Sequence, residues 1–588
     1  MKNILSLLLI FAVSVAFAQT DKRLKNYDAI INRIMTDWKV QGIAVAIVDK
    51  NKVIFAKGYG YRDTENKLPV TPATQFAIGS CTKAFTAAGV CLLKEDNVLD
   101  LDQPVRKYLP WFTLYDEYAS NNMTPRDLLC HRSGLPRHDL TWYGSPATRR
   151  ELVERLKYLQ PSKPFRTTYQ YQNLMFMTAG YLVGQLTGQS WESFTKQRLL
   201  DRMGMTSTNF SVAEMEKAAD RSLGYIERND KVEVIPYMNI DAVGPAGSIN
   251  STANDMAKWL ITLINGGNYN GQQVLSANTV REIQTPTMVA PAPVPLPYDE
   301  NGYATYGLGW SISSYRGHIR VEHGGNIDGF SASTCFLPRD SLGVVVLTNM
   351  NGSASTSLVR NYTIDKLLGL SEIDWNTRLL ADAKKAKEAA AGNKQASDAD
   401  RVAGTTPSHA LKAYVGRYEH PAYGVVEIAM NGDELALDIH GLKSGLKHYH
   451  YDYFEATNEQ YFNHDKINFS SDLKGNVDRL YMKLEPAVDD IVFERMPEIP
   501  ALTIDQMKKY IGDYDFGGMA AKVYAKKDKT LFLMVTGQPE YELTPSKTNE
   551  FTCKTLKGFV FRFNVDGQGN VTELVSNQPN GVYTAKRK

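Results

Sequence analysis

Hydrophobic and polar positions follow different patterns in the first and last parts of this chain. Two early apolar runs, residues 42–49 and 53–58, flank the polar sequence Lys50-Asn51-Lys52, which is typical of a β-hairpin. Further strand-like runs in this part come only much later, at residues 306–314, 331–337 and 342–349. Helical periodicity occupies the interval, at residues 84–95, 149–159, 174–186 and 253–264. The pattern predicts an α/β (α+β) fold, in which both ends of this part form an antiparallel sheet around a helical subdomain.

From about residue 409 the chain becomes rich in strand signals and repeats itself. The segment 414–418 (YVGRY) returns as 510–514 (YIGDY), 96 residues later, and Phe469 returns as Phe563, 94 residues later. Two copies of one small unit predict two β-rich, barrel-like accessory domains. The stretch before them, residues 382–401, is rich in Ala, Lys, Asp and Gln, which is typical of a helical or flexible linker.

The first 18 residues have the pattern of an export signal. Lys2 precedes an apolar stretch, and Ala16-Phe17-Ala18 forms a small-x-small cleavage site. A retained membrane anchor is the alternative. We expect an exported protein, periplasmic or extracellular, with no integral membrane segment once the signal is removed. The predicted limits are 1–18 for the signal peptide, 19–373 for the α/β domain, 374–408 for the linker, and 409–498 and 499–588 for the two β-rich domains.

Composition and charge narrow the classes of function. Hydrophobic residues make up 43% of the 588 positions, and 66 Lys and Arg nearly balance 64 Asp and Glu. A net charge of +2 argues against a nucleic-acid or anionic-membrane surface, which needs a concentrated basic face. The chain has no Gly-rich phosphate loop, no CxxC and no HExxH, so we expect no nucleotide cofactor and no metal. The five cysteines show no paired spacing and are expected to be free, buried thiols.

The first candidate for chemistry is Ser80-x-x-Lys83. Ser80 follows a short apolar run and a glycine and opens a helical stretch, so Ser80 and Lys83 share one helix face and the amine can reach the hydroxyl. Serine is a weak nucleophile that needs such a base, and the start of the helix supplies free N–H groups for an oxyanion. The motif alone is weak, because a solvated helix or loop explains the three other matches, Ser193/Lys196, Ser444/Lys447 and Ser471/Lys474.

Two further motifs follow in order. Tyr171-Gln-Asn173 combines a phenol that can relay a proton with an amide that can orient a lysine or a substrate, although an aromatic packed beside a helix start is the plainer reading. His323-Gly-Gly325, followed by Asn326, allows a ligand to approach the backbone closely, although an isolated HGG is more simply a Gly-rich turn.

With these three motifs in this order, the chain resembles the superfamily of serine β-lactamases and penicillin-binding proteins, especially its class C-like branch. That branch includes D-aminopeptidases, DD-peptidases, esterases and acyltransferases. The resemblance spans roughly residues 25–370, and the tail resembles the small β domains often appended to the branch. It implies an acyl-enzyme mechanism in which Ser80 attacks, Lys83 and Tyr171 share the general-base work, and Tyr171 protonates the leaving group.

The resemblance also implies the substrate-binding residues. Asn173 would position Lys83 and the substrate, the backbone N–H groups of Ser80 and Asn326 would form the oxyanion hole, and Gly325 would let a ligand approach the backbone. His323 would line the cleft and help to hold the Tyr171 proton network or a substrate carboxylate. No cofactor is implied.

Position 323 also bears on the substrate, because many β-lactamases carry lysine there. A histidine is mostly neutral at pH 7 and binds a carboxylate less strongly. We therefore expect an ester or amide substrate, with a D-amino-acid peptide among the candidates, and either hydrolysis or acyl transfer. A class C-like β-lactamase or DD-peptidase is one alternative, and a non-catalytic cell-wall or ligand-binding protein is another. An oligomer built through the C-terminal domains is also expected.

Overall fold

The computed structural model describes residues 21–588 except 463, 498–501, 527–529, 554–555, 557–558 and 579–580, and it describes only the backbone of 390–399 and 459. The expected signal peptide lies outside the described residues, as does the boundary expected at residue 498.

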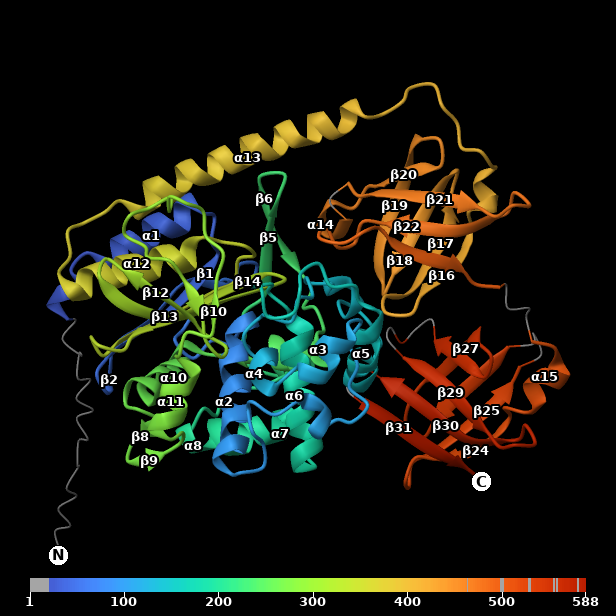
Figure 1. Cartoon of the computed structure of the whole chain (residues 1–588), viewed down its shortest axis with the longest axis horizontal. Helices are drawn as coiled ribbons and strands as arrows, with labels where there is room; N and C mark the ends of the chain where they lie inside the picture. Colours follow the sequence, from blue (N-terminus) through green and yellow to red (C-terminus); the bar gives the residue numbers. More distant parts are fainter. Residues whose placement is uncertain are drawn as a thin grey trace, which may run out of the picture.

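A nine-stranded antiparallel sheet forms the centre of the first domain (Figure 1). As predicted, it joins the two ends of the α/β part, because β1 pairs with β15 on one side and with β2 on the other. In sheet order the strands are β10 (Met288–Val289), β11 (Thr305–Tyr306), β12 (Ser311–Tyr315), β13 (His318–Ile327), β14 (Phe330–Leu337), β15 (Leu342–Thr348), β1 (Gly42–Asp49), β2 (Lys52–Asp63) and β3 (Leu68–Pro69).

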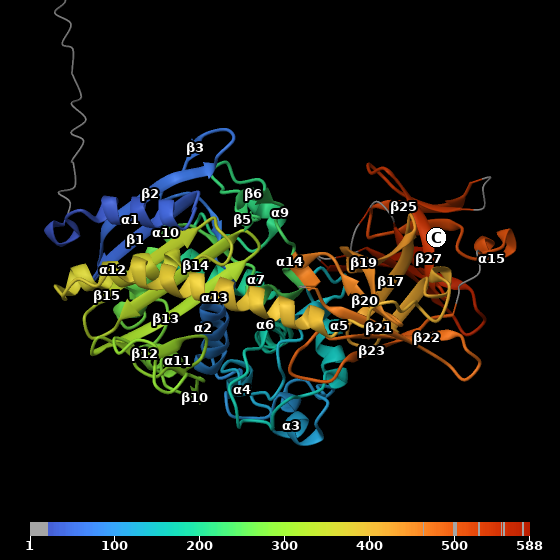
Figure 2. The ribbon, with the colours of Figure 1, turned by 90° about the horizontal axis from the view of Figure 1, so that it is seen from above.

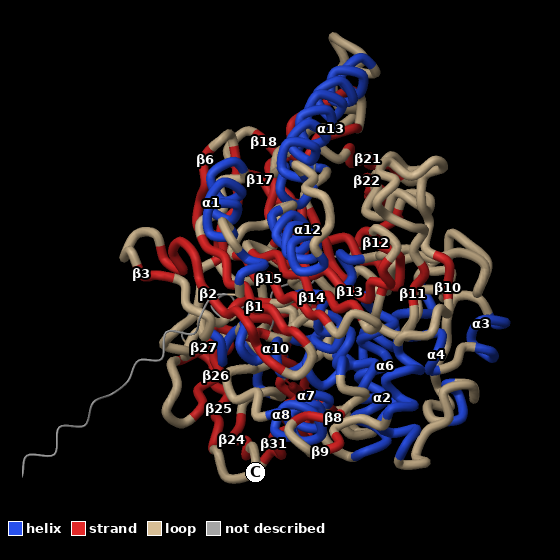
Figure 3. The backbone as a smooth tube through the Cα atoms, turned by 90° about the vertical axis from the view of Figure 1, so that its left-hand side faces the viewer, coloured by secondary structure: helices blue, strands red, loops and turns tan. Residues whose placement is uncertain are grey.

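Helices cover both faces of this sheet, which explains why β1 is apolar along its whole length. Successive side chains of a strand point to opposite faces. Ile43, Val45 and Ile47 pack under α1 (Tyr27–Asp37) and α12 (Ser355–Leu368), whereas the alternate alanines pack on α10 (Ala253–Ile264). Figure 3 shows α1 and α12 above the sheet and α10 below it. The sequence pattern predicted α10 with its observed limits but not α1 or α12.

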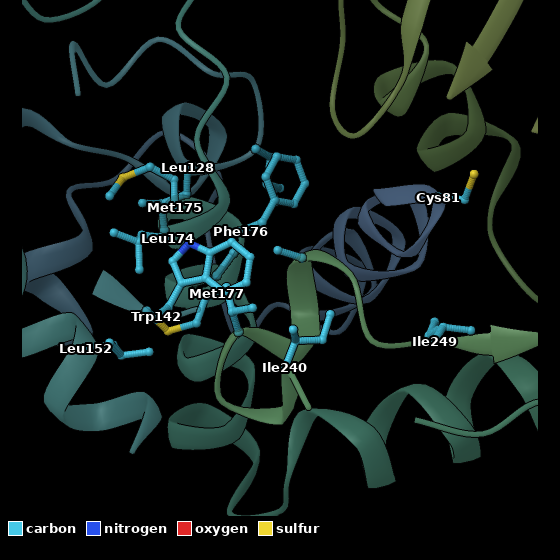
Figure 4. Packing of buried hydrophobic residues seen from close by; sticks show 14 of the residues in the cluster. Cys81, Leu128, Trp142, Leu152, Leu174, Met175, Phe176, Met177, Ile240 and Ile249 are labelled. Atoms are coloured by element: carbon cyan, nitrogen blue, oxygen red, sulfur yellow. The ribbon is translucent and has the colours of Figure 1, made fainter. Parts of the chain in front are cut away.

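The helical subdomain is built around α2 (Thr82–Glu95) and α6 (Asn173–Thr187), which are buried on most sides. Figure 4 shows part of its core, with Trp142 among Leu152, Leu174 and Met177. Shorter helices surround the pair: α3 (Glu117–Asn122), α4 (Pro125–Leu128), α5 (Arg149–Arg155), α7 (Trp191–Thr195), α8 (Asp201–Met203), α9 (Val212–Met215) and α11 (Ala277–Ile283). Three small two-stranded sheets lie beside them: β4 (Phe76–Ala77) with β7 (Asn250–Ser251), β5 (Gly224–Arg228) with β6 (Lys231–Ile235), and β8 (Asn268–Tyr269) with β9 (Gln272–Gln273).

Two predicted elements were wrong in extent. The strand expected at 306–314 is split into β11 and β12, since Gly309 adopts a left-handed conformation with φ of 74°. The helix expected at 149–159 ends at Arg155 and continues as a 3₁₀ turn over Leu156–Tyr158. The alternative of a Gly-rich turn at residues 324 and 325 is contradicted, because β13 runs through both glycines, which pair with Ser333 and Ala332 of β14.

The last strands form two closed eight-stranded barrels, which confirms the predicted repeat. The first barrel comprises β16 (Gly416–His420), β17 (Gly424–Asn431), β18 (Glu434–Ile439), β19 (Leu442–His450), β20 (Tyr453–Ala456), β21 (Lys466–Ser471), β22 (Val477–Met482) and β23 (Ile491–Arg495), with α14 (Glu459–Phe462). The second comprises β24 (Gly512–Asp515), β25 (Ala520–Ala525), β26 (Leu531–Val535), β27 (Glu540–Lys547), β28 (Glu550–Cys553), β29 (Val560–Val565), β30 (Val571–Gln578) and β31 (Gly581–Arg587), with α15 (Ile504–Lys508).

Equivalent side chains make equivalent contacts in the two barrels. Tyr418 Oη donates to the carbonyl of Tyr414 at 2.8 Å, and Tyr514 Oη donates to the carbonyl of Tyr510 at 2.7 Å. In each barrel the arginine that ends the last strand donates to a backbone carbonyl in the first part of the motif. The first barrel shares one continuous hydrophobic core with the helical subdomain, whereas the second has a core of its own.

Helix α13 (Trp375–Ala399) runs from the sheet domain toward the first barrel (Figure 2). Its mostly polar sequence matches a connecting element. Within the described part of the chain, no helix combines the length and the apolar character that crossing a bilayer requires. All five cysteines are buried, and Cys81, Cys91, Cys130 and Cys335 are free thiols.

Candidate active site

Ser80 lies in a 3₁₀ turn, Gly79–Cys81, directly before α2. The turn packs against β13 so closely that both contact positions are glycine. A Cβ atom on Gly325 would lie 1.9 Å from the carbonyl oxygen of Ile78, and one on Gly79, where φ is 49°, would lie 2.8 Å from Asn326 N. The close approach therefore brings the backbone of β13 beside Ser80, which is itself only partly buried.

Lys83 is fully buried in the first turn of α2, with its amine against Ser80. Its Nζ lies 2.9 Å from Ser80 Oγ and 2.8 Å from both Asn173 Oδ1 and the carbonyl oxygen of Ala246. Burial holds the pKa of Lys83 well below its ordinary value, and the positive charge of Arg137 lowers it further. A neutral amine in this position donates its two protons to the amide and carbonyl oxygens and turns its lone pair toward the Ser80 hydroxyl. This is the geometry of a general base.

Tyr171 closes the other side of Ser80. Burial raises the pKa of Tyr171, and a side-chain hydrogen bond with Ser80 lowers it by less. The phenol is therefore neutral in the free protein and carries a proton that it can donate. The ring stacks on His131 with centroids 4.2 Å apart, and Lys83 Nζ lies 4.8 Å from its centre. The buried His131 thus supports the Tyr171 ring.

Asn173 begins α6 and connects Lys83 to a carboxylate. Its Oδ1 accepts from Lys83, and its Nδ2 donates to Asp139 Oδ1 at 3.0 Å. Asp139 Oδ2 accepts from Arg137 Nε at 2.6 Å. The Arg137 guanidinium lies 5.1 Å from the centre of the Tyr171 ring, and 54% of the side chain is exposed. A charged pair thus continues the hydrogen-bond network beyond the residues found from the motifs.

His323 is buried, with both ring nitrogens occupied by the protein. Nδ1 donates to the carbonyl of Gly324 at 2.6 Å, so Nε2 accepts from Tyr306 Oη at 2.8 Å. Burial, followed by the charge of Lys83, lowers the pKa of His323 to about 4. The imidazole is therefore neutral at pH 7 and spans Tyr306 and the β13 backbone.

The exposed edge of β13 forms the wall opposite Tyr171. Pairing between β12 and β13 ends at Ser311 and Glu322, so the following residues have no strand partner on that side. The Asn326 side chain is held by Ser331 Oγ at 2.9 Å and Gly352 N at 2.8 Å, both of which donate to its Oδ1. This anchoring fixes the backbone of Asn326 next to the Ser80 turn.

A cleft of about 700 Å³ opens over these groups. The motif residues that line it are Ser80, Tyr171, His323, Gly325 and Asn326, and Lys83 and Asn173 lie beneath its floor. The structure thus brings together all seven candidate residues. It adds Arg137, Tyr306 and Arg360 to the lining, none of which the motifs indicated. Arg360 forms an ion pair with Glu322, which also pairs with Arg320. Nothing in the sequence around Arg137 matches one of the three motifs, so no local signal indicated a cleft residue there.

Comparison with known proteins places the chain among β-lactamase-like proteins. The family model described as "Beta-lactamase" matches residues 27–369, and a "Domain of unknown function (DUF3471)" matches residues 400–495. An unguisins hydrolase, ungD', from Aspergillus campestris is 34% identical over 422 residues, which cover 68% of this chain and 76% of the relative. Protein flp of Staphylococcus aureus is 26% identical over 351 residues, which cover 58% of this chain and 66% of the relative.

Solved structures show the same fold. An octameric penicillin-binding protein homologue from Pyrococcus abyssi aligns with a TM-score of 0.52 at 22% identity, covering 87% of this chain and 98% of its own. A D-amino acid amidase from Ochrobactrum anthropi, complexed with D-phenylalanine, aligns with a TM-score of 0.50 at 23% identity, covering 58% and 98%.

Proposed function

Because the chain belongs to the beta-lactamase family and is a serine hydrolase, we propose that it cleaves an ester or amide bond through an acyl-enzyme formed on Ser80. The observation that carries this proposal is the 2.9 Å contact between Ser80 Oγ and the buried amine of Lys83.

In the acylation step, Ser80 Oγ attacks the substrate carbonyl carbon while its proton passes to Lys83 Nζ. The backbone N–H groups of Ser80 and Asn326 receive the negative charge that develops on the carbonyl oxygen. Collapse of the tetrahedral intermediate then breaks the bond to the leaving group. The neutral phenol of Tyr171 donates its proton to the leaving oxygen or nitrogen and is reprotonated from Lys83. The lowered pKa of Lys83 suits a proton acceptor, and the raised pKa of Tyr171 suits a proton donor.

Deacylation reverses the direction of proton transfer. A water molecule attacks the acyl carbonyl carbon while one of its protons passes to Lys83 Nζ. The tetrahedral intermediate then collapses, the bond to Ser80 Oγ breaks, and the proton on Lys83 passes to Oγ. An alcohol or amine that enters in place of water produces acyl transfer. We include this reaction in the proposal, and product analysis with an added alcohol tests it.

The neutral His323 supports an ester or amide without a carboxylate as the preferred substrate. Its nitrogens are both bonded inside the protein, so it offers no cation to an anionic group. Among the amides we include D-amino-acid derivatives, because the fold neighbour from Ochrobactrum anthropi is named as a D-amino acid amidase.

The first experiment compares labelling by a fluorophosphonate and turnover of a p-nitrophenyl ester and a D-phenylalanine p-nitroanilide. Wild type is set against Ser80→Ala, Lys83→Met and Ser193→Ala. Ser193 is a matched control, since it also begins a Ser-x-x-Lys motif but its lysine is exposed and paired with Asp201. We expect labelling and turnover to be lost in Ser80→Ala, to fall about 10²–10⁴-fold in Lys83→Met and to be unchanged in Ser193→Ala. Equal activity in wild type and Ser80→Ala would refute the proposal, and a non-catalytic binding protein would not label.

A second candidate function, turnover of a carboxylate-bearing β-lactam or D-alanyl peptide, is favoured by Arg137. Its guanidinium is half exposed in the cleft, and among the described residues only Asp139 accepts from it, through Nε. The terminal nitrogens can therefore bind a carboxylate. Turnover of a chromogenic cephalosporin that is lost in Arg137→Gln, while ester turnover remains, would establish this function. No cephalosporin turnover by wild type would exclude it.

Export and self-association are also part of the proposal. The N-terminal pattern supports cleavage after Ala18, so the mature protein recovered outside the cytoplasm should begin at Gln19; an uncleaved N-terminus would contradict this. For the oligomer expected through the barrels, the support is the octameric state in the name of the Pyrococcus abyssi fold neighbour. Light scattering tests it, since a monomer has a mass near 65.7 kDa.

A further inference from the structure

The three consecutive side chains of the turn at residues 137–139 contact three different parts of the protein. Arg137 lies over the Tyr171 ring in the cleft, His138 faces the first barrel, and Asp139 accepts a hydrogen bond from Asn173. One short segment thus joins the barrel to the candidate active site.

His138 occupies an unfavourable backbone conformation that needs outside support. Its φ of 48° and ψ of 38° lie in the left-handed region, which is unfavourable for a residue with a side chain. Such conformations persist only where the surroundings determine them. His138 is almost completely buried, so its surroundings are other parts of the protein and not solvent.

The first barrel supplies the hydrogen-bond partners of the His138 backbone N–H and of one of its two ring nitrogens. Its backbone N–H donates to Glu485 Oε2 at 3.0 Å. In the ring, Nε2 lies 3.0 Å from the carbonyl oxygen of Gln160, which can only accept, so Nε2 carries the proton. Nδ1 therefore accepts from Tyr423 Oη, 2.7 Å away. Burial also lowers the pKa of His138, which agrees with a neutral ring of fixed tautomer.

Both barrel residues are themselves held firmly. Tyr423 is completely buried, and Glu485 is 7% exposed. Glu485 Oε1 accepts from the backbone N–H of Ala487 at 3.1 Å, which leaves Oε2 for His138. Burying a carboxylate costs free energy unless hydrogen-bond donors satisfy it. The two backbone N–H groups that donate to the buried Glu485 therefore indicate a specific interface.

From the turn, an unbroken chain of hydrogen bonds leads to the nucleophile. Asp139 accepts from Asn173 at 3.0 Å, Asn173 accepts from Lys83 at 2.8 Å, and Lys83 contacts Ser80 at 2.9 Å. Displacement of the turn would therefore move the groups that orient Lys83 and would change its distance from the charges of Arg137 and Asp139.

The opposite wall of the cleft is tied to the same barrel. His440 Nδ1 donates to the carbonyl of Tyr143 at 3.2 Å, and the Tyr143 ring lies 6.1 Å from that of Tyr461. Tyr143 Oη in turn donates to Asp328, two residues beyond Asn326. The barrel thus contacts segments that lead to the base and to the oxyanion side of the cleft.

We propose that the first barrel is a positioning domain, in which Glu485 and Tyr423 hold the His138 turn and thereby keep the Asp139–Asn173–Lys83 network aligned on Ser80. This proposal rests on the proposed function of Ser80 and Lys83. It assigns a role to the segment that matches the domain of unknown function.

The test uses full-length variants and the rate of fluorophosphonate labelling, resolved into an inactivation rate constant and a binding constant. Glu485→Ala removes the acceptor for His138, Glu485→Gln keeps an acceptor oxygen, and Glu434→Ala changes an exposed glutamate of the same barrel. We expect Glu485→Ala to lower the inactivation rate constant about 10- to 100-fold with little change in binding, because small misplacements of catalytic groups cost this much. Glu434→Ala should stay within about threefold of wild type, and Glu485→Gln, which keeps one of the two acceptor oxygens, should lose less of the labelling rate than Glu485→Ala.

The pH profile separates positioning from loss of structure. Arg137 lowers the pKa of Lys83 more than Asp139 raises it, so when the turn relaxes, the pKa of Lys83 rises. The acid limb of labelling in Glu485→Ala should therefore move to higher pH, which a partly unfolded population would not cause. If Glu485→Ala does not fold, Tyr423→Phe, which removes one hydroxyl, should give a smaller fall with the same displacement.

Each remaining outcome decides between the two proposals. Wild type that labels on Ser80 together with a folded Glu485→Ala that labels at the same rate and pH would overturn the positioning role alone. An unchanged Tyr423→Phe, where Glu485→Ala does not fold, would do the same. Wild type that does not label would overturn the proposed function, and the positioning role with it.

Discussion

Replacing Gly325 by alanine tests the contact between β13 and the Ser80 turn without removing any side chain from the cleft. The added Cβ would lie 1.9 Å from the carbonyl oxygen of Ile78 and 3.1 Å from Ser80 N, whereas ordinary contact begins near 3.4 Å. The strand and the turn would have to separate by about 1.5 Å. Both close partners are backbone atoms, so no side chain can rotate to relieve the contact.

A separation of this size should abolish most activity. Misplacing reacting groups by about 1 Å costs roughly 100-fold in rate, so we expect at least that loss for Gly325→Ala in ester turnover and in fluorophosphonate labelling. Overpacking should also lower the free energy of unfolding by about 1–3 kcal/mol, measured by urea denaturation.

The neighbouring glycine provides the control. At Gly324 the nearest atom to an added Cβ is the carbonyl oxygen of Ala332, at 3.8 Å, which is an ordinary contact. Gly324→Ala should therefore retain activity within a few-fold of wild type. Equal rates in the two alanine variants would show that the close approach at residue 325 does not matter for catalysis.

Three further outcomes are expected. Arg137→Gln should raise the pKa of Lys83 and move the acid limb of kcat/KM to higher pH, because it removes a positive neighbour of the amine. Arg137→Lys keeps the charge and should leave the acid limb in place. An unmoved limb in Arg137→Gln would contradict the electrostatic role of Arg137. Burial lowers the pKa of His323 to about 4, below its ordinary value near 6.5, so the unfolded chain binds more protons between these values. Resistance to urea should therefore fall as the pH falls from 6.5 to 4, less steeply in His323→Gln; equal slopes would contradict this. Leu174→Ala, in the core shown in Figure 4, should lower the free energy of unfolding by about 2–5 kcal/mol, against less than about 0.5 kcal/mol for the exposed Met430→Ala; similar losses would refute the packing argument.

The sequence predicted local geometry in the site better than distant contacts. Ser80 and Lys83 are three residues apart at a helix start, so their contact follows from helix geometry alone. Tyr171 and His323 were expected nearby only through a family resemblance. That His323 bonds to Tyr306 and Gly324 with both nitrogens could not be predicted, because it depends on the pairing of strands and on the tautomer.

The same distinction holds for the fold. The hairpin at residues 42–58 and helix α10 have strong local patterns, and they form as expected. The glycines of β13 favour a turn locally, but the partner strand and the need for close approach to Ser80 override that preference. The contact between His138 and Glu485 joins residues 347 positions apart and two domains, so no local pattern could indicate it.

The antiparallel pairing of β1 with β15 has a consequence for biosynthesis. Val45 pairs with Val346, so about 300 residues must be made after β1 before its second neighbour exists. At about 5–20 residues per second, this takes roughly 15–60 s. During that interval a strand that is apolar on both faces has only the β2 hairpin beside it. The nascent chain therefore carries an unpaired apolar edge for about half of its translation, and its yield should depend on the chaperones that shield that edge more than on the stability of the finished fold.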